Sequence, residues 1–405
     1  MEESFVIVPF SNFDIEGAAS VGSHPGMGHT GLYDMAGNVR EWCFNATDDS
    51  GELRYIMGGS WGEPTYMFTH KDAQSPWHRS AQNGFRCVRF SQENESIVHE
   101  FRQSLPLPVW RDISGLEPFS DEEFNSYRDM YQYDPTPLYH SVERVDSNSP
   151  FWREETITFD AAYAGHRVTV HLFLPKAGKP PYQTVIFFPG GSAVTTTSFK
   201  KLTYKTLWQG IVTSGRAVLF PIYYGTYERP SEHGREWTIK SAAKTPLVYR
   251  DWTIRMAKDL RRSIDYLQTR DDIDSRKIGY YGYSNGSLVG TIMLSVEDRI
   301  DTGIFVHGGL LPIELPRSFD LALYAQRVKV PVLMINGAED ALAPVKTCQL
   351  PMVEMLKKAN AETEHKLYPG GHGQFSLFFE QIRSDALDWL DRYLGPVDVM
   401  KSDMK

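Results

Sequence analysis

The 405-residue sequence predicts an α/β fold, in which a mostly parallel, eight-stranded sheet with helices on both faces follows a small, irregular, loop-rich domain. Two observations predict this fold. After residue 150, short apolar runs alternate with helical patterns, which is typical of a buried parallel sheet. Before about residue 90, Gly, Asn, Trp and Ser dominate and no clear periodicity is visible. The chain is also longer than a typical single domain.

Shifts in composition along the chain predict the domain boundaries. We expect an N-terminal domain over residues 1–90, a charged, proline-containing connector with one helix over 91–150, the main α/β domain over 151–396 and a polar tail over 397–405.

The N-terminal domain contains three short motifs, GLYDMAGNVREW at residues 31–42, GGSW at 58–61 and NGFRC at 83–87. In this order they resemble the C-terminal part of the formylglycine-generating (sulfatase-modifying factor) domain. The oxidase chemistry of that family uses two cysteines spaced C-x4-C after the Gly-Gly-Ser motif, and here Glu63 and Phe68 occupy those positions. Without thiolates that bind copper or react with oxygen, we expect this truncated domain to be catalytically silent.

Members of that family also bind calcium through a Gly-Asn-Val-x-Glu loop, which Asn38 and Glu41 match. Two alternatives stay open here, a calcium site and a purely structural loop, because so few oxygen ligands do not define a calcium site. No metal site and no cofactor is predicted. The three cysteines, Cys43, Cys87 and Cys348, do not cluster with histidines at metal-ligand spacing and are expected to be free thiols.

The connector contains one expected helix, over residues 121–131. Ser120 is placed to cap it, three acidic residues follow in its first turn, and Phe124, Tyr127 and Tyr131 share one face. We expect this face to pack against the main domain, and the Asp-Pro-Thr-Pro sequence that follows to end the helix.

The main domain begins with two strands in which apolar and polar side chains alternate, at residues 155–159 and 167–174, and we expect them to pair antiparallel. The next six strands are continuous apolar runs, as expected of parallel strands covered on both faces. They are predicted at residues 184–188, 217–221, 278–282, 303–306, 330–335 and 365–368. Helical patterns lie between them, and a last helix is expected around residues 378–394.

The strand at residues 278–282 continues into Gly282-Tyr283-Ser284-Asn285-Gly286, a G-x-S-x-G sequence followed by an apolar helical segment. In a nucleophile elbow of this kind, the serine lies on a strained turn between a strand and a helix, and the two glycines avoid a collision with the neighbouring element. The pentapeptide also occurs by chance in Gly-rich turns. The strand before it and the helix after it favour the catalytic interpretation, with Ser284 as nucleophile.

A serine nucleophile needs an imidazole that takes its proton and a carboxylate that orients the imidazole. Asp340 lies in the loop after the strand at 330–335, and His372 lies in the loop after the next strand, which is the order Ser, acid, His expected of this turn type. Glu339 is the alternative acid. The structural alternatives are a turn-forming aspartate and a surface histidine between glycines.

Two N–H groups are expected to stabilise an oxyanion near Ser284. One is the backbone N–H of Asn285, and the other is that of Gly191, in the Pro-Gly-Gly-Ser sequence after the strand at 184–188, with Ser192 as the neighbouring alternative. His307, which follows another strand, is expected to be a pocket residue.

Two further segments have open interpretations. The tyrosines Tyr223, Tyr224 and Tyr227 either line a substrate pocket or cover the core. The segment at residues 230–246 is long for a connection and is predicted to form a small cap over the site.

Residues 151–395 resemble the dipeptidyl aminopeptidase, acylaminoacyl peptidase and dienelactone hydrolase group of α/β-hydrolases, through the sequences at 282–286, 337–344 and 370–372. The resemblance implies an α/β-hydrolase fold and cleavage of carboxylic esters, aryl esters among them, through an acyl-enzyme. The first alternative is a serine peptidase of the same group, and the second is a non-catalytic binding module. The whole chain also looks like the C-terminal end of bacterial Ser/Thr-kinase-linked proteins, although it contains no kinase motif.

Composition and charge exclude some classes of binding partner. A net charge of −9 and the lack of basic runs argue against nucleic acid, and no apolar run is long enough to cross a membrane. The first residues lack a basic region followed by an apolar stretch, so we expect a cytoplasmic location. The expected partner is a small-molecule ester, and the sequence does not predict an oligomeric state.

Overall fold

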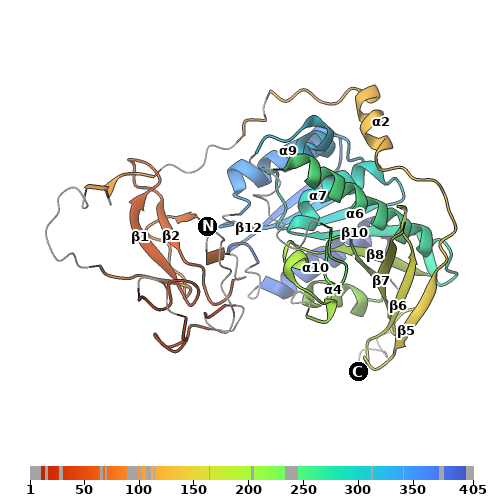
Figure 1. Ribbon diagram of the computed structural model, residues 1–405, viewed down its shortest axis with the longest axis horizontal. Helices are drawn as coiled ribbons and strands as arrows, with labels where there is room; N and C mark the ends of the chain where they lie inside the picture. The colour runs from red at the N-terminus through yellow and green to blue at the C-terminus, as the bar shows by residue number, and fades with distance from the viewer. Residues whose placement is uncertain are drawn as a thin grey trace. The chain divides into compact units, whose positions relative to one another are not determined.

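The computed structural model describes most of the chain and divides it into two compact units (Figure 1). Unit 1 comprises residues 1–109, 337–344 and 369–377, and unit 2 comprises residues 110–336, 345–368 and 378–405. The residues described are 11–13, 17–26, 31–63, 67–68, 71–88, 99–100, 102–105, 111–113, 115–163, 165–201, 205–232, 245–311, 313–340, 342–373 and 378–397.

Unit 1 contains a small four-stranded sheet with the order β3-β2-β1-β4. Strand β1 (Arg40–Ala46) pairs antiparallel with β2 (Arg54–Met57), and β2 pairs antiparallel with β3 (Asp72–Gln74). Strand β4 (Asn83–Gly84) pairs parallel with β1. These strands are short and separated by turns, which agrees with the irregular, loop-rich domain predicted from the sequence.

A buried ion network lies inside this sheet domain. The Arg40 guanidinium donates hydrogen bonds to Glu63, with Nε 2.8 Å from Oε2, and also to Asp72. Glu63 is fully buried, and its Oε2 accepts two more hydrogen bonds from the N–H and hydroxyl of Ser60. Burial lowers the pKa of Arg40, but the hydrogen bond with Glu63 and the charge of Asp72 outweigh burial and raise it above its ordinary value. Glu63 is therefore saturated with structural contacts.

Unit 2 is built on a sheet with the order β13-β12-β11-β10-β8-β9-β7-β6-β5. All eight predicted strands are present, and β6 pairs antiparallel with β7 as expected. Their bounds are β6 (Trp152–Asp160), β7 (Arg167–Pro175), β8 (Tyr182–Phe188), β9 (Ala217–Ile222), β10 (Ile273–Tyr283), β11 (Thr302–Val306), β12 (Val332–Gly337) and β13 (Thr363–Tyr368).

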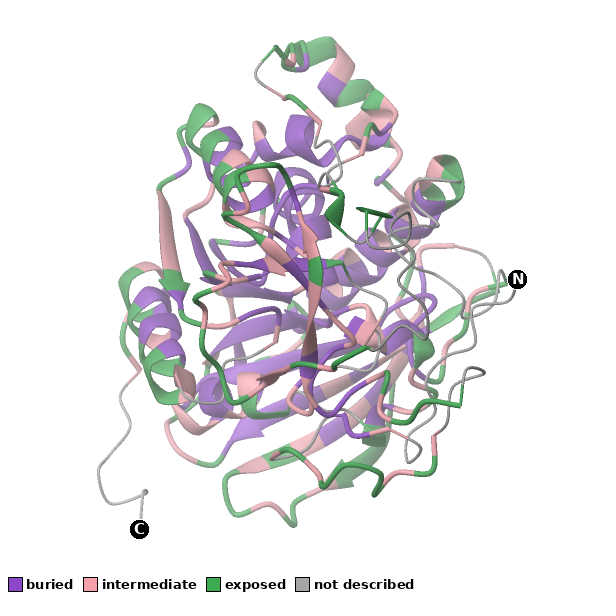
Figure 2. Ribbon diagram, turned by 90° about the vertical axis from the view of Figure 1, so that its left-hand side faces the viewer, coloured by how far each residue is buried: buried purple, intermediate pink, exposed green. Residues whose placement is uncertain are grey.

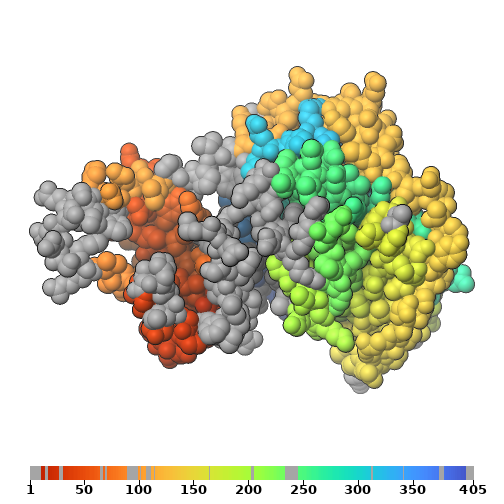
Figure 3. All heavy atoms as spheres, viewed as in Figure 1, coloured from red at the N-terminus to blue at the C-terminus, as the bar shows by residue number. Residues whose placement is uncertain are grey.

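A ninth strand, β5 (Ser141–Asp146), lies at the edge of this sheet and pairs antiparallel with β6. The sequence predicts a connector over these residues and no strand. The side chains of β5 are almost all exposed, including Val142 and Val145, so the strand buries no apolar face and has no clear pattern of apolar alternation. The β5–β6 hairpin is yellow in Figure 3, where it lies at the surface.

The central parallel strands end level with one another. In the register of the sheet, Gly282 of β10 pairs with Phe188 of β8 and with Phe305 of β11, and Val306 pairs with Ile335 of β12. Because parallel strands present their carboxyl ends at one edge of a sheet, the residues that follow β8, β10, β11 and β12 leave the sheet at the same edge.

Helices cover both faces of this sheet (Figure 1). Tyr280 of β10 points to one face, where its hydroxyl donates to the Gly286 carbonyl at the start of α7. Thr302 of β11, one register step away, points to the other face, where its hydroxyl accepts from Trp389 of α10. The helices are α3 (Ser192–Thr195), α4 (Lys205–Thr213), α6 (Pro246–Leu267), α7 (Asn285–Val296), α8 (Leu321–Ala325), α9 (Leu350–Lys358) and α10 (Phe379–Leu394), with short turns at Phe199–Lys201, Arg317–Phe319 and Val345–Gln349.

The core of unit 2 lies between the sheet and these helices. Strands β8, β9, β11 and β12 are buried along almost their whole length, as predicted for continuous apolar runs. Figure 2 shows buried residues in purple, and strands in the interior have this colour. Continuous apolar runs in the sequence thus predict which strands are buried on both faces of the sheet.

Helix α2 (Asp121–Asp129) forms where it was expected and packs against this core. The Ser120 hydroxyl accepts a hydrogen bond from the Glu123 N–H at 3.0 Å and caps the helix. Phe124 and Tyr131 are buried beside Tyr324 of α8, with ring centroids 6.3 and 6.2 Å away. The predicted packing of this helix against the main domain is confirmed.

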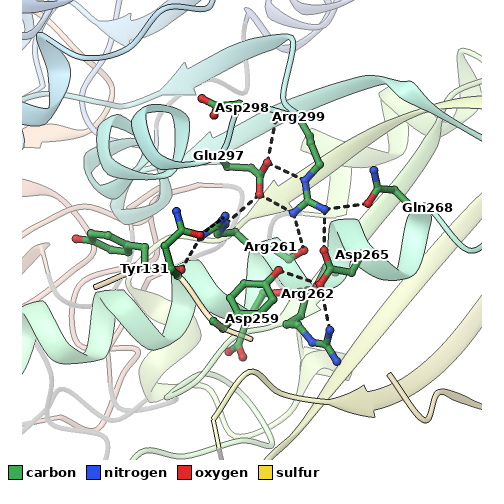
Figure 4. Close-up of polar contacts among 12 residues, drawn as sticks. Tyr131, Asp259, Arg261, Arg262, Asp265, Gln268, Glu297, Asp298 and Arg299 are labelled. Atoms are coloured by element: carbon green, nitrogen blue, oxygen red, sulfur yellow. Dashed lines mark hydrogen bonds and ion pairs between the residues drawn. The ribbon is translucent and has the colours of Figure 1, made fainter. Parts of the chain in front are cut away.

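An arginine-rich network joins α6 to the segment after α7 (Figure 4). Arg299 donates to Asp265 of α6 at 2.7 Å and to Glu297 at 2.7 Å. Arg261 of α6 contacts Glu297 as well and donates to the Tyr131 carbonyl at 2.6 Å. The network therefore fixes the end of α7 and the residues after α2 against the long helix α6.

Some predicted features fall outside the described residues. Most of the cap expected at residues 230–246 lies in 233–244, most of the polar tail lies in 398–405, and residues 91–98 of the connector are also outside. No helix in the part of the chain that the structure describes combines the length and apolarity that a membrane span requires.

Candidate active site

Ser284 lies between the end of β10 and the start of α7, on a strained backbone. Its φ is +50° and its ψ is −108°, a conformation that residues other than glycine rarely adopt. A side chain at either flanking glycine would collide with backbone: an added Cβ would lie 2.6 Å from Gly286 C at Gly282 and 2.3 Å from the Phe188 carbonyl oxygen at Gly286. The geometry is that of a nucleophile elbow.

Hydrogen bonds from neighbouring elements hold this strained turn. The Ser284 N–H donates to the Val306 carbonyl at 2.8 Å, and the Ser287 hydroxyl is 2.7 Å from the Gly282 carbonyl oxygen and 2.8 Å from that of Val306. The buried Tyr280 hydroxyl donates to the Gly286 carbonyl at 2.6 Å. These contacts fix the backbone of the turn on both sides of Ser284.

The loop after β8 borders the serine. An added Cβ at Gly190 would lie 3.3 Å from the Ser284 Cβ, and the Gly286 N–H donates to the Pro189 carbonyl at 3.1 Å. Within the described ranges, the N–H groups of Gly191, Ser192 and Asn285 have no hydrogen-bond acceptor. Three donors thus remain available on the two segments that meet at Ser284.

Asp340 and His372 are brought together in unit 1. His372 Nδ1 lies 2.8 Å from Asp340 Oδ2, and both residues are only 3% exposed. The other carboxylate oxygen, Oδ1, accepts hydrogen bonds from the N–H groups of Leu342 and Ala343 at 2.9 Å each. Asp340 therefore accepts hydrogen bonds within its own turn and also contacts the histidine.

The neighbouring carboxylate has a different partner. Glu339 Oε2 lies 3.1 Å from His78 Nε2, in the same unit, and the Nδ1 of that histidine is 2.9 Å from Asn83 Nδ2. The contact with His372 is thus made by Asp340 and not by Glu339.

The acid and histidine loops pack backbone against backbone. An added Cβ at Gly337 would lie 2.3 Å from the Gly370 carbonyl oxygen, and the Glu339 N–H donates to that same oxygen at 3.0 Å. This close approach brings the two loops near enough for the short contact between Asp340 and His372.

His307 follows β11 at the same edge of the sheet. It is buried with a φ of +55°, its N–H donates to the Ile335 carbonyl at 2.9 Å, and its ring is edge-on to Tyr283 with centroids 5.7 Å apart. The ring therefore lies next to the residue that precedes Ser284.

Of the two interpretations of the tyrosines after β9, packing in the core is the one the structure bears out. Tyr223 is buried and stacks on Phe188 at a centroid distance of 4.0 Å, and Tyr227 is buried against Phe199 and Phe220.

One residue near the elbow was missed by the sequence analysis. Tyr249, in the first turn of α6, donates a hydrogen bond from its hydroxyl to Asn285 Oδ1 at 3.1 Å. Tyr249, Trp252 and Met256 follow helical spacing on the apolar face of α6, so the tyrosine looks like any other core aromatic in the sequence.

The Asn38–Glu41 loop of unit 1 does not fit calcium. Asn38 Oδ1 accepts hydrogen bonds from Asn12 Nδ2 and the Ala19 N–H, and both oxygens of Glu41 accept from Arg86 at 2.8 to 3.2 Å. A dication would have to displace the guanidinium, which favours the structural alternative. Among the described residues, none of Cys43, Cys87 and Cys348 forms a disulfide, in agreement with the sequence-based expectation.

Comparison with known families identifies both parts of the chain. Residues 10–91 match the profile of the sulfatase-modifying factor enzyme 1-like domain, and residues 169–385, more than half of the chain, match that of the dienelactone hydrolase family. Both predicted resemblances are confirmed. A search of curated proteins gave no significant match.

Solved structures similar to this chain include several hydrolases. Acetyl xylan esterase 1 from Thermoanaerobacterium sp. JW/SL YS485 is 16% identical, with a TM-score of 0.52 over 68% of this chain and 96% of that one. The acetyl xylan esterase from Paenibacillus sp. R4 is also 16% identical, with a TM-score of 0.52 over 70% and 97%. The Pyrococcus horikoshii acylaminoacyl peptidase is 17% identical, with a TM-score of 0.48 over 63% and 44%. The two esterases confirm the α/β-hydrolase fold.

Proposed function

Because the chain belongs to the dienelactone hydrolase family, we propose that it hydrolyses carboxylic esters with Ser284 as nucleophile, His372 as general base and Asp340 as the residue that orients the base. The observation that carries the proposal is the backbone of Ser284, held at φ +50° between two glycines at the end of β10. Such strain persists only where the surrounding structure imposes it, and it is typical of catalytic sites.

Sheet topology supports a meeting of the three side chains. Ser284 directly follows β10, Asp340 is three residues beyond β12, and His372 is four residues beyond β13. Strands β10, β11 and β12 are parallel and in register, so their carboxyl ends lie at one edge. In open α/β sheets the chemistry is performed at that edge.

In the first half of the proposed reaction, Ser284 Oγ attacks the ester carbonyl carbon while His372 Nε2 removes the hydroxyl proton. Asp340 accepts a hydrogen bond from His372 Nδ1, which keeps Nε2 free to act as base and stabilises the imidazolium that forms. The C–O bond to the alcohol then breaks, and His372 returns the proton to the leaving alkoxide.

Negative charge develops on the carbonyl oxygen in both halves of the reaction. The Asn285 N–H and the Gly191 N–H are proposed to stabilise it, with Ser192 as the alternative donor in the same loop, and each such donor contributes about 3–4 kcal/mol to catalysis. In the second half, His372 removes a proton from water, the hydroxide adds to the acyl carbon, and Ser284 leaves with the proton from His372.

The proposed substrate is a small-molecule ester. Because the two similar esterases act on acetyl xylan according to their names, acetyl esters are the first class to test, followed by aryl esters. The cytoplasmic location and the lack of a nucleic-acid partner that the sequence predicts remain part of this proposal.

The nucleophile is tested with a fluorophosphonate probe, which reacts with activated serines. We expect an adduct on Ser284 and its loss in Ser284→Ala, together with a fall of at least about 10³-fold in ester hydrolysis. Ser295→Ala is the matched control, since this buried serine lies on α7, the helix that follows Ser284, and its hydroxyl donates to the Ile292 carbonyl. Wild-type protein without an adduct would favour the non-catalytic alternative.

The bond type is tested by comparing p-nitrophenyl acetate and butyrate with aminoacyl-nitroanilides. We expect kcat/KM to be higher for the esters. Rapid cleavage of the anilides with slow cleavage of the esters would instead favour the peptidase alternative.

A further inference from the structure

We propose that Tyr249 is a positioning residue for the oxyanion hole, because its hydroxyl holds the side chain of Asn285 and thereby fixes the peptide whose N–H faces the developing charge. This inference rests on the proposed ester hydrolysis. The contact joins α6 to the first residue of α7, two elements that are distant in sequence.

The contact is a buried hydrogen bond between two side chains. The Tyr249 hydroxyl oxygen lies 3.1 Å from Asn285 Oδ1, and the two residues are only 1% and 6% exposed. Burial raises the pKa of the tyrosine well above its ordinary value, so the hydroxyl keeps its proton and acts as donor at every pH at which the enzyme would work.

The tyrosine itself is held firmly. Its ring packs edge-on against Phe319 with centroids 4.8 Å apart, and Trp252 lies one turn further along α6 at 6.1 Å. The Thr253 hydroxyl donates to the Tyr249 carbonyl at 2.9 Å. A hydroxyl on a ring packed in this way is a fixed point from which Asn285 can be oriented.

The peptide between Ser284 and Asn285 is the part of the elbow that this contact controls. Tyr280 holds the Gly286 carbonyl, and Ser287 holds the Gly282 carbonyl, on either side of it. Among the described residues, the Asn285 N–H has no acceptor, so its direction is fixed by the strained Ser284 backbone and by the Asn285 side chain. Tyr249 completes a set of three hydroxyl contacts around the turn.

Removal of the hydroxyl has a defined chemical consequence. Asn285 Oδ1 would become a buried acceptor without its partner, and such a group turns toward any available N–H. The N–H groups proposed for the oxyanion lie on the elbow itself and on the loop after β8 that borders it. The side chain would then compete with the substrate for those donors, which raises the barrier to the tetrahedral intermediate without removing the triad.

Tyr249→Phe is the direct test, since it deletes the hydroxyl and keeps the ring. Loss of a whole oxyanion donor lowers kcat by about 10²–10³-fold, so a misplaced donor is expected to lower it by about 10-fold, with less than about a 2-fold change in KM. The affinity for an alkyl boronic acid, which forms a tetrahedral adduct with the serine, is expected to fall by about the same factor as kcat.

Tyr324→Phe is the matched control. This tyrosine is also fully buried in unit 2, and its hydroxyl donates to a backbone carbonyl, that of Ser318, at 3.1 Å. We expect it to change the thermal unfolding midpoint about as much as Tyr249→Phe and to leave kcat and boronic acid affinity unchanged. A purely structural role for Tyr249 predicts that the two variants behave alike.

A double-mutant cycle with Asn285→Ala gives an independent measure, and kcat of Asn285→Ala alone serves if Tyr249→Phe unfolds. Asn285→Ala alone is expected to lower kcat by about 10-fold, and Tyr249→Phe is expected to have no further effect in that background. The inference is wrong if Tyr249→Phe lowers kcat equally in the wild-type and Asn285→Ala backgrounds. It is also wrong if the wild-type protein is active and Tyr249→Phe leaves its kcat unchanged. Failure of the ester hydrolysis proposal is distinct, because the wild-type protein itself would then be inactive.

Discussion

At the scale of single residues, the proposed site depends on a few atoms whose positions follow from local backbone chemistry. Ser284 holds a conformation that costs about 1–3 kcal/mol, and buried hydrogen bonds from Tyr280 and Ser287 offset that cost. Asp340 combines a turn with a side-chain contact, since one carboxylate oxygen accepts from two N–H groups and the other lies at hydrogen-bond distance from His372 Nδ1.

The two carboxylate oxygens of Asp340 have different partners, and this difference leads to a prediction. Asp340→Asn keeps an oxygen that can accept from Leu342 and Ala343, but its amide N–H₂ no longer selects the correct tautomer of His372. We expect kcat for p-nitrophenyl acetate to fall by about 10⁴-fold with little change in the thermal unfolding midpoint.

Glu339→Gln is the control for that variant, because Glu339 contacts His78 and not His372. It is expected to retain most of the activity. A loss in Glu339→Gln as large as that in Asp340→Asn would contradict the assignment of the acid.

The residues of the proposed site could be predicted from the sequence where they stand beside a characteristic pattern. Ser284 lies in a G-x-S-x-G turn, and Asp340 and His372 follow strands in the order that this turn implies. Tyr249 could not be predicted, because its hydroxyl reaches Asn285 only through the packing of α6 on α7, while its spacing is that of a core residue.

At the scale of elements, close backbone contact decides how the acid and histidine loops are arranged. Gly337, at the end of β12, lies against the Gly370 carbonyl with no room for a side chain. Gly337→Ala must therefore push the two loops apart and lengthen the contact between Asp340 and His372.

We expect Gly337→Ala to lower kcat by about 10²-fold or more, because a displacement of about 1 Å at the base is enough for such a loss. Gly191→Ala is a suitable comparison, since an added Cβ there would have no heavy atom within 4 Å. Unchanged kcat in Gly337→Ala would mean that the loops relax without disturbing the pair.

A second element-scale contact ties the entry of β10 to β6 and gives a prediction on pH. Arg270 donates to both oxygens of Asp272 at 2.7 Å and to Glu155 of β6 at 2.6 Å. The hydrogen bonds from Arg270 hold the pKa of Asp272 below its ordinary value. A carboxyl group with a depressed pKa in the folded state stabilises the fold above its unfolded pKa, and the contribution is lost as pH falls through the folded pKa.

Asp272→Asn is therefore expected to lower the free energy of unfolding by about 1 kcal/mol at pH 7. The difference from wild type is expected to shrink as pH falls below about 4, the ordinary pKa of an aspartate, and to vanish once pH falls through the lower folded-state pKa of Asp272. Urea unfolding at pH 7 and pH 3 measures both quantities. A difference that does not depend on pH would show that charge on Asp272 is not its source.

The elements themselves could be predicted to different extents. Central strands bury both faces and leave continuous apolar runs in the sequence, so all eight predicted strands are present. Strand β5 could not be predicted, because an exposed edge strand is specified by hydrogen bonds to β6, and its side chains carry no pattern of burial.

At the scale of the whole molecule, the chain combines a hydrolase fold with a small domain that matches the sulfatase-modifying factor enzyme 1-like profile. Glu63 stands at a position where the resemblance to the sulfatase-modifying family implies a cysteine. It offers no thiolate, and its buried carboxylate already accepts hydrogen bonds from Arg40. The domain is therefore expected to contribute structure and not oxidation.

The ion network predicts a stability effect confined to unit 1. Arg40→Met would leave Glu63 and Asp72 buried without their cation, and we expect a loss of about 3–5 kcal/mol. Hydrogen exchange is expected to accelerate in β1 to β3 and to stay unchanged in α6 and β10. Arg54→Met, at a more exposed site on β2, is the control, and equal acceleration in both units would contradict the separation.

The most direct test of the central claim is to trap the acyl-enzyme. The protein is mixed with p-nitrophenyl acetate, quenched with acid within the first turnovers and digested, and the peptide that contains residue 284 is sequenced by mass spectrometry. The proposed mechanism predicts an acetyl group on Ser284 of the wild-type protein. No acetylated peptide is expected from the Ser284→Ala or Asp340→Asn variant at the same time point. Hydrolysis with the acetyl group on another residue, or with none on the protein at any time, would contradict it.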